Sequence, residues 1–190
     1  MDYIEVYVLP DKKINPSFDK DIFQEVLRYF KKKIASRKYA CFQKQVMKSF
    51  SKNLILEETY DDISTQTIPV KENMYTLNNK SLKDTLYESL VPLGVVNYSS
   101  KQIKPIHKFP STTELYEKTL EEKVVFKINN RLFVNFSTTT YKSDPNEKYY
   151  YIYMNYNNSD KCDVKMNVTS MIDICSIIKE CYTAIITNNN

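Results

Sequence analysis

Carboxylates that could take part in acid–base or metal chemistry gather at one point of the sequence, between Leu56 and Asp62. In an extended strand, Glu57 and Asp61 would share one face and Glu58 and Asp62 the other, because side chains alternate between faces. Two acids on one face offer the oxygen ligands that Mg²⁺ prefers. The same residues also fit the solvated end of a strand that runs into an acidic turn, so both interpretations stay open.

Other residue types that support catalysis are scarce or poorly spaced. The single histidine, His107, lies in the proline-bracketed stretch Lys104–Pro110, where a solvent-facing loop position and a Cys-His pair are the alternatives. Cys175 and Cys181 are six residues apart, about 240° around a helix axis, so their thiols do not converge. The single glycine, Gly94, excludes the Walker A loop, the dinucleotide-binding fingerprint and the nucleophile elbow. We therefore expect no catalytic residue, no metal site and no cofactor.

The net charge of +4 comes from one basic segment, which runs from Arg28 to Lys52. This segment holds no Asp or Glu, whereas the rest of the chain carries 18 of the 27 cations and all 23 acids. Its cations are the candidate binding residues: Arg28, Lys31, Lys32, Lys33, Arg37, Lys38, Lys44, Lys48 and Lys52. Aromatic residues lie among them, as in proteins that hold single-stranded nucleic acid by phosphate contacts and base stacking. Docking on an acidic protein and a solvated face without a partner are the alternatives.

A second feature is a run of tyrosines between Tyr149 and Tyr156. In a strand, this run puts large side chains on both faces. Either the strand is central, with layers packed on both sides, or one face is an interface, where tyrosine is favoured for its contact area and polar tip. Tyr149, Tyr151 and Tyr153 share one face and are the candidate interface residues.

Alternating apolar residues predict several strands. They are expected at Tyr3–Val8, Leu54–Tyr60, Val95–Val96, Val124–Ile128, Leu132–Phe136 and Lys148–Tyr156. Residues Tyr39–Phe50 fit either a strand or a helix, and their pattern favours a strand. The turn Asn129-Asn130-Arg131 between two apolar runs predicts a β-hairpin, because asparagine tolerates a positive φ. A longer loop containing Asp144-Pro145-Asn146 is expected to follow the hairpin.

The helical pattern predicts three to four helices. They are a helix capped by Ser17 and ending near Ile34, one from Ser81 to Leu90, a short one ending near Leu120, and an amphipathic C-terminal helix over Val168–Ile186. Hairpins with flanking helices give an α+β fold, in which the helices pack on a mainly antiparallel sheet. We expect a single domain over residues 1–190.

The order of these elements resembles the tunnel-shaped RNA triphosphatase (CYTH) family, which opens with an E-x-E strand and a helix and closes with an R-x-D-L-T hairpin, an acidic strand and a helix. Tyr7 stands where the second carboxylate of E-x-E would be, and residues 131–138 (RLFVNFST) resemble the hairpin. The tyrosine run stands where alternating glutamates belong. Of the carboxylates that would ligate metal in that family only Glu5 is present, so the resemblance implies a catalytically inactive relative that acts as a scaffold.

Composition adds a prediction of source and compartment. The chain has 24 Lys against 3 Arg, a skew typical of A/T-rich genomes, including those of large cytoplasmic DNA viruses. The N-terminus lacks an apolar signal region, and Met171–Ile186 is too short and too charged to span a bilayer. We expect a non-enzymatic interaction or structural protein of a virion or host cytoplasm, with a protein partner or second copy and no membrane contact. A nucleic-acid-associated transcription or RNA-processing factor, which would bind single-stranded nucleic acid, is the alternative.

Overall fold

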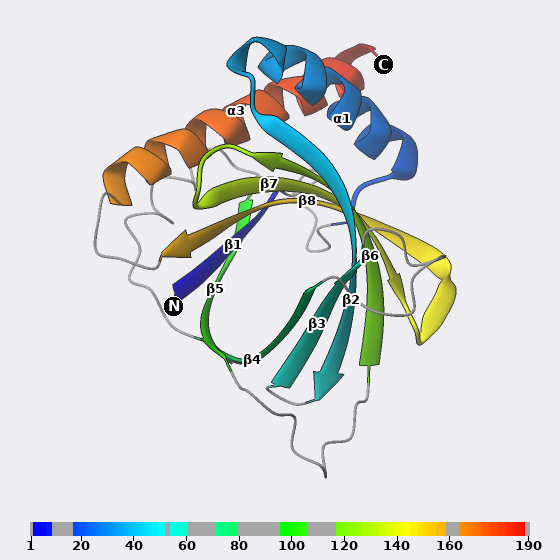
Figure 1. The fold of residues 1–190 in the computed structure, drawn as a ribbon. Helices are drawn as coiled ribbons and strands as arrows, with labels where there is room; N and C mark the ends of the chain where they lie inside the picture. Colours follow the sequence, from blue (N-terminus) through cyan, green and yellow to red (C-terminus); the bar gives the residue numbers. More distant parts are fainter. Residues whose placement is uncertain are drawn as a thin grey trace.

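The computed structural model describes residues 2–8, 17–51, 54–60, 71–79, 96–105, 117–158 and 164–188. These residues form an antiparallel barrel of strands β1 (Asp2–Val8), β2 (Ala40–Ser51), β3 (Leu54–Tyr60), β4 (Lys71–Asn79), β5 (Val96–Pro105), β6 (Glu117–Lys127), β7 (Leu132–Tyr141) and β8 (Asp144–Asn158). The barrel is closed in the order β1-β5-β4-β3-β2-β6-β7-β8, with β8 paired to β1 (Figure 1). Helices α1 (Lys20–Ile34) and α3 (Val164–Asn188) and the 3-10 helix η1 (Ala35–Arg37) complete this part of the chain.

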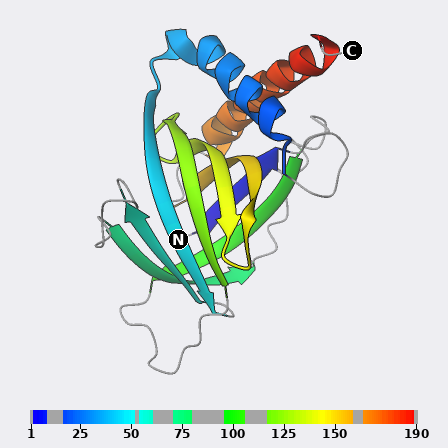
Figure 2. The ribbon, with the colours of Figure 1, turned by 90° about the vertical axis from the view of Figure 1, so that its right-hand side faces the viewer.

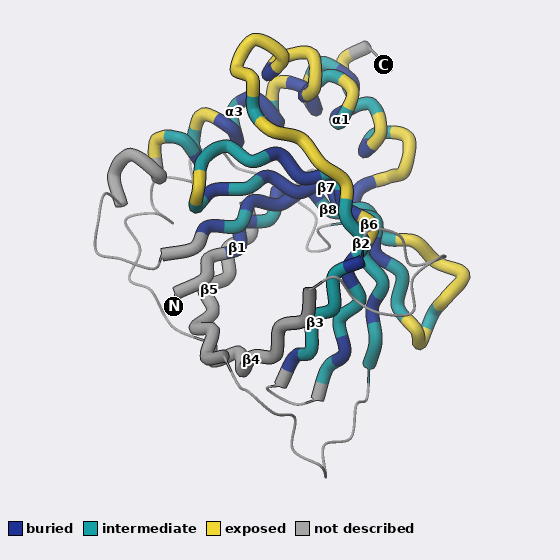
Figure 3. The backbone as a smooth tube through the Cα atoms, viewed as in Figure 1, coloured by how far each residue is buried: buried dark blue, intermediate teal, exposed yellow. Residues whose placement is uncertain are grey.

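The two α-helices lie together over one wall of the barrel, as two views at right angles show (Figures 1 and 2). The core fills the space between these helices and the outward faces of β1, β6, β7 and β8, where the buried segments concentrate (Figure 3). Its fully buried members include Val6, Phe30, Val134, Phe136, Ile152, Met154, Ile174 and Ile178. One face of these strands is therefore committed to packing against helices, and the other face is turned to the barrel interior.

Helix α1 begins at a side-chain cap and buries one stripe. The carboxylate of Asp19 accepts hydrogen bonds from the backbone N–H groups of Asp21, at 2.9 Å, and Ile22, at 3.4 Å. The expected cap, Ser17, instead accepts a hydrogen bond from the backbone N–H of Tyr150 and ties the chain to β8. The buried stripe recurs at helical spacing and consists of Phe23, Val26, Phe30 and Ile34.

The expected hairpin is confirmed as β6 and β7. The side-chain oxygen of Asn129 accepts hydrogen bonds from the backbone N–H groups of Arg131, at 2.8 Å, and Leu132, at 2.9 Å. This local bonding fixes the turn and therefore the register of the two strands, in which Lys123 lies opposite Ser137.

The α+β class, the antiparallel pairing and the C-terminal helix are confirmed, but three to four helices are not supported. The described residues hold two α-helices and the short η1, and the helix expected at Ser81–Leu90 lies outside them. The short helix expected to end near Leu120 is wrong from Glu117 onward, because these residues pair with both β2 and β7 as part of β6. The expected loop around Asp144-Pro145-Asn146 is also wrong, since β8 begins at Asp144 after a tight turn. Neither described α-helix is long and apolar enough to cross a membrane.

Replacing Phe30 by Ala tests the packing between α1 and the barrel. Phe30 is completely buried, and its ring centroid lies 5.2 Å from that of Phe126 and 5.3 Å from that of Phe136. The cavity left behind should lower the free energy of unfolding by about 3–5 kcal/mol, measured by urea denaturation. Tyr29→Ala, at the neighbouring half-buried position, is the matched control. An equal loss in both variants would contradict the packing described here.

Candidate functional site

The interior face of the barrel carries the polar residues that the core does not use. On β7, Leu132 and Phe136 pack outward against the helices, and the alternate residues Asn135, Ser137 and Thr139 face inward. These three polar residues are buried without belonging to the apolar core. These inward-facing polar side chains, held on rigid strands, are therefore candidates for binding or catalysis.

Strand pairing aligns the interior residues into rows that run across the barrel wall. The first row contains Lys44, Lys123, Ser137 and Tyr151, the second Val46, Glu121, Thr139 and Tyr149, and the third Glu57, Lys48, Thr119 and Tyr141. Directly opposed residues on antiparallel strands share a face. Lysines, acids and tyrosines from five strands of the chain therefore meet on one inner surface.

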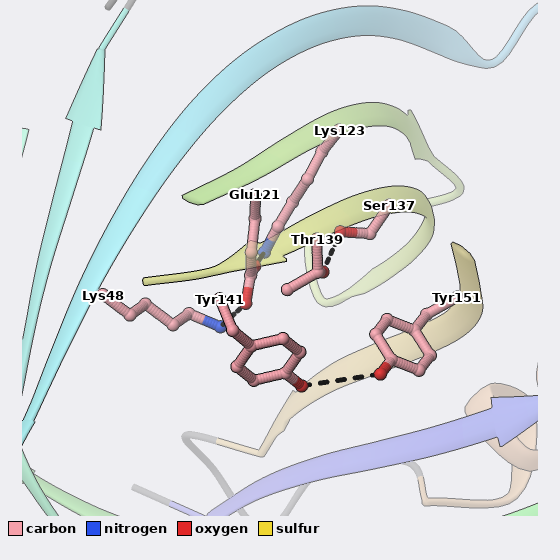
Figure 4. A network of polar contacts seen from close by, with 7 residues as sticks. All are labelled: Lys48, Glu121, Lys123, Ser137, Thr139, Tyr141 and Tyr151. Carbon is pink, nitrogen blue, oxygen red and sulfur yellow. Dashed lines mark hydrogen bonds and ion pairs between the residues drawn. The ribbon is translucent and has the colours of Figure 1, made fainter. Parts of the chain in front are cut away.

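Two lysines of this surface share one carboxylate. The Lys48 ammonium lies 2.9 Å from Glu121 Oε1, and the Lys123 ammonium pairs with Glu121 Oε2 (Figure 4). The side chains are 14% exposed for Lys48, 12% for Glu121 and 5% for Lys123. Lys123 Nζ also lies 5.5 Å from the ring centroid of Tyr153, over its face. We refer to Lys48, Glu121 and Lys123 as the interior ion-pair network.

The protonation behaviour of the network follows from its burial and its charges. Burial acts to raise the pKa of Glu121, but the adjacent Lys123 and Lys48 outweigh it and lower the pKa to about 2. Burial lowers the pKa of Lys123 to about 8, although Glu121 opposes this shift. Glu121 is therefore a carboxylate at neutral pH. Lys123 is an ammonium group whose burial costs free energy of folding.

The surroundings of Lys123 carry charges of both signs. The charged groups that act on it are Glu121, Lys48, Lys44 and Glu57, and Glu5 is buried on the same inner face. In the same inner surface, the buried hydroxyl of Thr119 has no hydrogen-bond partner among the described residues. Several lysines and the Thr119 hydroxyl at one place offer hydrogen-bond donors to a polar, anionic ligand.

Tyrosines form the neighbouring wall of the interior. Tyr7 on β1 stacks on Tyr153 with ring centroids 5.1 Å apart, and it meets Tyr151 edge-on at 6.1 Å. The hydroxyls of Tyr141 and Tyr151 lie 3.5 Å apart (Figure 4). Burial raises the pKa of both Tyr7 and Tyr151, so their hydroxyls remain protonated hydrogen-bond donors. The candidate interface residues Tyr149, Tyr151 and Tyr153 thus face the barrel interior, while Ile152 and Met154 between them pack toward the helices.

The candidate basic residues are divided between two places. Arg28, Lys33 and Arg37 form ion pairs with Glu25, Glu180 and Asp173 on the outer helical layer. Lys31, Lys32 and Lys38 are exposed there as well. Lys44 and Lys48 instead face the barrel interior, and Lys52 lies outside the described residues. The basic segment is contiguous in sequence, but the passage from helix to strand splits it into two separate sites.

The candidate carboxylates do not assemble a metal site in the described part of the chain. Glu57 faces the interior opposite Lys48, whereas Glu58 is on the other face of β3 and accepts a hydrogen bond from the Tyr60 hydroxyl at 3.2 Å. Asp61 and Asp62 lie outside the described residues. Within the ranges described, no group of three His, Cys, Asp or Glu residues could hold a metal ion.

The carboxylate that the family resemblance singles out does not change this result. Glu5 is buried on the interior face of β1 opposite Asn155, and the carboxylate of Glu121 is engaged by two ammonium groups. A divalent cation needs several free oxygen ligands around one point. The described residues therefore do not fit a carboxylate-held metal.

The described cysteines have no catalytic setting. Cys175 and Cys181 are buried in the core between α3 and the barrel. Burial raises the pKa of the Cys175 thiol to about 12, which leaves it without nucleophilic thiolate at neutral pH. Cys41 is exposed on β2, and Cys162 and His107 lie outside the described residues.

Sequence reasoning missed Glu121, Lys123 and Thr119, and it named Tyr7 only as the residue that replaces a carboxylate. The signal that could have found Glu121 and Lys123 is their spacing of two residues on the first strand of the predicted hairpin. This spacing puts an acid and a lysine on the strand face that also carries Ser137 and Thr139. Their pairing with Lys48 could not be found in this way, because β2 lies about 70 residues earlier in the chain.

Solved structures with a similar fold include RNA triphosphatases. The Mimivirus capping enzyme triphosphatase superposes with a TM-score of 0.59 at 7% identity, covering 94% of this chain and 89% of its own. The S. pombe RNA triphosphatase Pct1 superposes with a TM-score of 0.56 at 9% identity, covering 98% of this chain and 82% of its own. Pct1 in complex with the Spt5 CTD gives a TM-score of 0.54 at 9% identity, covering 97% of this chain and 81% of its own. No protein-family model and no curated protein matches the sequence.

The resemblance to tunnel-fold RNA triphosphatases is confirmed as a likeness of fold. At these identities the likeness concerns the fold alone. The expectation of a non-enzymatic interaction or structural protein is wrong, because the structures that share this architecture over nearly the whole chain are enzymes. That expectation rested on missing sequence motifs, whereas the interior ion-pair network is assembled from separate strands and has no motif.

Replacing Glu121 by Gln tests the network through the pH dependence of stability. The folded-state pKa of Glu121, about 2, lies below the ordinary value of 4.5, so its carboxylate stabilises the fold above about pH 4.5. This contribution, about 3 kcal/mol, is lost as the pH falls toward 2. Urea denaturation between pH 7 and pH 2 should show a smaller loss in Glu121→Gln than in the parent chain. Glu25→Gln, at the exposed pair with Arg28, should retain the parental pH profile, and a parental profile in Glu121→Gln would contradict the network.

Proposed function

We propose that the barrel interior binds a chain of phosphates and that the protein is a phosphohydrolase acting on a triphosphate, with the 5′ end of RNA as its substrate. The observation that carries this proposal is the cluster of Lys44, Lys48 and Lys123 on the inner surface of the barrel. The likeness of fold to RNA triphosphatases supports the same substrate class. The substrate and the reaction belong to the proposal.

On binding, phosphate is expected to replace the Glu121 carboxylate as the anion that contacts Lys48 and Lys123. Without a ligand, Glu121 pairs with both ammonium groups, and Lys44 and Glu57 lie nearby. A phosphate chain supplies several charged oxygens, so it can accept hydrogen bonds from Lys48 and Lys123 in place of the Glu121 carboxylate. The Thr119 hydroxyl is a further donor at the same surface. Binding is therefore expected to weaken steeply as salt is added.

The same lysines are the groups that would assist hydrolysis. A water oxygen forms a bond to the terminal phosphorus, the bond from that phosphorus to the bridging oxygen breaks, and the diphosphate end leaves with the electron pair. The proton of the attacking water passes to solvent. Fixed ammonium groups stabilise the negative charge as it spreads over the terminal oxygens and the leaving group, and their burial strengthens this effect.

The outer helical layer is the candidate contact surface for a protein partner. Pct1 is solved in complex with the Spt5 CTD, which supports a protein partner for this chain as well. The exposed cations Lys31, Lys32 and Lys38 suit an acidic segment of such a partner. A role in processing RNA ends, in the host cytoplasm or the virion, agrees with the viral and RNA-processing proteins among the structural neighbours.

Two substitutions within the interior ion-pair network should change phosphate binding in opposite directions. Lys48→Gln removes a donor and should weaken the binding of inorganic tripolyphosphate by about 10- to 100-fold, which is the cost of one charged hydrogen bond. Glu121→Gln removes the competing carboxylate and should strengthen binding. Titration calorimetry at 50 mM salt measures both changes, and release of phosphate from 5′-triphosphate RNA measures the reaction.

Lys32→Gln is the matched control, because Lys32 is exposed on α1 outside the barrel. It should leave both binding and phosphate release unchanged, and thermal melting of each variant verifies that it is folded. The proposal is wrong if the unaltered protein neither binds tripolyphosphate nor releases phosphate. It is also wrong if Lys32→Gln weakens binding as much as Lys48→Gln does.

A further inference from the structure

Tyr149 and Tyr151 present parallel rings beside the lysine-bearing rows. Their ring planes differ by 6°, and their centroids are 6.4 Å apart. Both side chains are half-buried, so solvent reaches them. They are consecutive inward-facing residues on β8, and the length of two strand residues, about 6.6 Å, sets the spacing of their rings.

The distance between these rings suits a third planar group. Rings in direct face contact lie at the short end of the aromatic range of about 4.5–7 Å, whereas this pair lies near its long end. A nucleobase stacks on each neighbour at about 3.4 Å, so one base between two rings needs about 6.8 Å. The centroid separation of 6.4 Å is the upper limit of the gap between the ring planes, so a base between them requires a side-chain rotation that widens the gap by at least about 0.4 Å. The strand therefore sets the two tyrosines close to the spacing that one base requires.

Neighbouring side chains support the two rings. Tyr141 meets the Tyr149 ring edge-on at 5.2 Å, and its hydroxyl lies 3.5 Å from that of Tyr151. The hydroxyl of Tyr149 is hydrogen-bonded to Glu147, the main cause of its raised pKa. These contacts orient the two rings.

The position of the pair relative to the lysines fits a nucleotide. Tyr151 shares a row with Lys123, and Tyr149 shares the next row with Glu121. Strand β7 separates β8 from β6, so the backbones that carry the tyrosines and Lys123 are two strand spacings apart, about 10 Å. The sugar and phosphate chain of a nucleotide bridges such a distance, with the base at the tyrosines and the terminal phosphates at the lysines.

We infer that Tyr149 and Tyr151 form a stacking site for a nucleobase, so that the barrel selects nucleoside triphosphates and triphosphate-ended RNA over inorganic polyphosphate. This inference rests on the proposed function, since it requires the phosphates to lie at the interior lysines. Stacking is tolerant of base identity because every base has a π-face. The site therefore distinguishes the presence of a base rather than its type.

Replacing Tyr149 by Ala removes one wall of the stacking site. ATP should bind about 5- to 100-fold more weakly to this variant, whereas inorganic tripolyphosphate should bind as it does to the parent protein. Tyr149→Phe keeps the ring and should bind both ligands at parental strength. Tyr29→Ala, on the outer helix α1, is the control for the loss of a tyrosine elsewhere and should change neither affinity.

A fluorescence reporter makes the test independent of affinity. The chain has no tryptophan, so Tyr149→Trp introduces a single emitter at the proposed site. ATP should quench its emission by stacking, and tripolyphosphate at a saturating concentration should not. Equal quenching by both ligands would overturn the inference.

The outcomes separate this inference from the function on which it rests. Unchanged ATP affinity in Tyr149→Ala, or an equal loss of affinity for ATP and tripolyphosphate, overturns the stacking site. In either case, tripolyphosphate binding to the parent protein still supports the phosphate site. If the parent protein binds neither ligand, the proposed function is wrong and the stacking site is wrong with it.

Discussion

The shared carboxylate of Glu121 is the interaction on which the interior of this barrel depends. Two buried ammonium groups, from Lys48 and Lys123, would repel each other if no acid lay between them. Lys44 and Glu57 lie near this network on the same inner surface. Removing charged groups from water costs stability even when they are paired, and groups with perturbed pKa values cluster at functional sites.

The two faces of the strands have different roles: one packs against the helices, and the other lines the barrel interior. The outward faces of β1, β6, β7 and β8 bury apolar residues under α1 and α3, so this wall is stable without any contribution from its inward side. The inward face can then carry lysines, acids and tyrosines on a rigid scaffold. The same division explains the tyrosine run: Ile152 and Met154 belong to the core, whereas Tyr151 and Tyr153 belong to the interior surface.

Local sequence patterns predicted most of the helices and strands but few of the contacts between them. The hairpin follows from one asparagine-rich turn, and the stripe that contains Val26 and Phe30 follows from helical spacing, because the determining contacts are close in sequence. The interior ion-pair network could not be predicted from the sequence, because it depends on the register of β2 against β6, which are far apart in the chain. A run of cations such as that from Arg28 to Lys48 shows no break in sequence, although the fold puts its two ends on different surfaces.

The most direct measurement is a crystal structure of the protein with inorganic tripolyphosphate at moderate salt. The account predicts phosphate oxygens within hydrogen-bond distance of the ammonium groups of Lys48 and Lys123, inside the barrel and beside Thr119. Tripolyphosphate bound instead at the exposed lysines of α1, with the pairs to Glu121 intact and no phosphate in the interior, would contradict it.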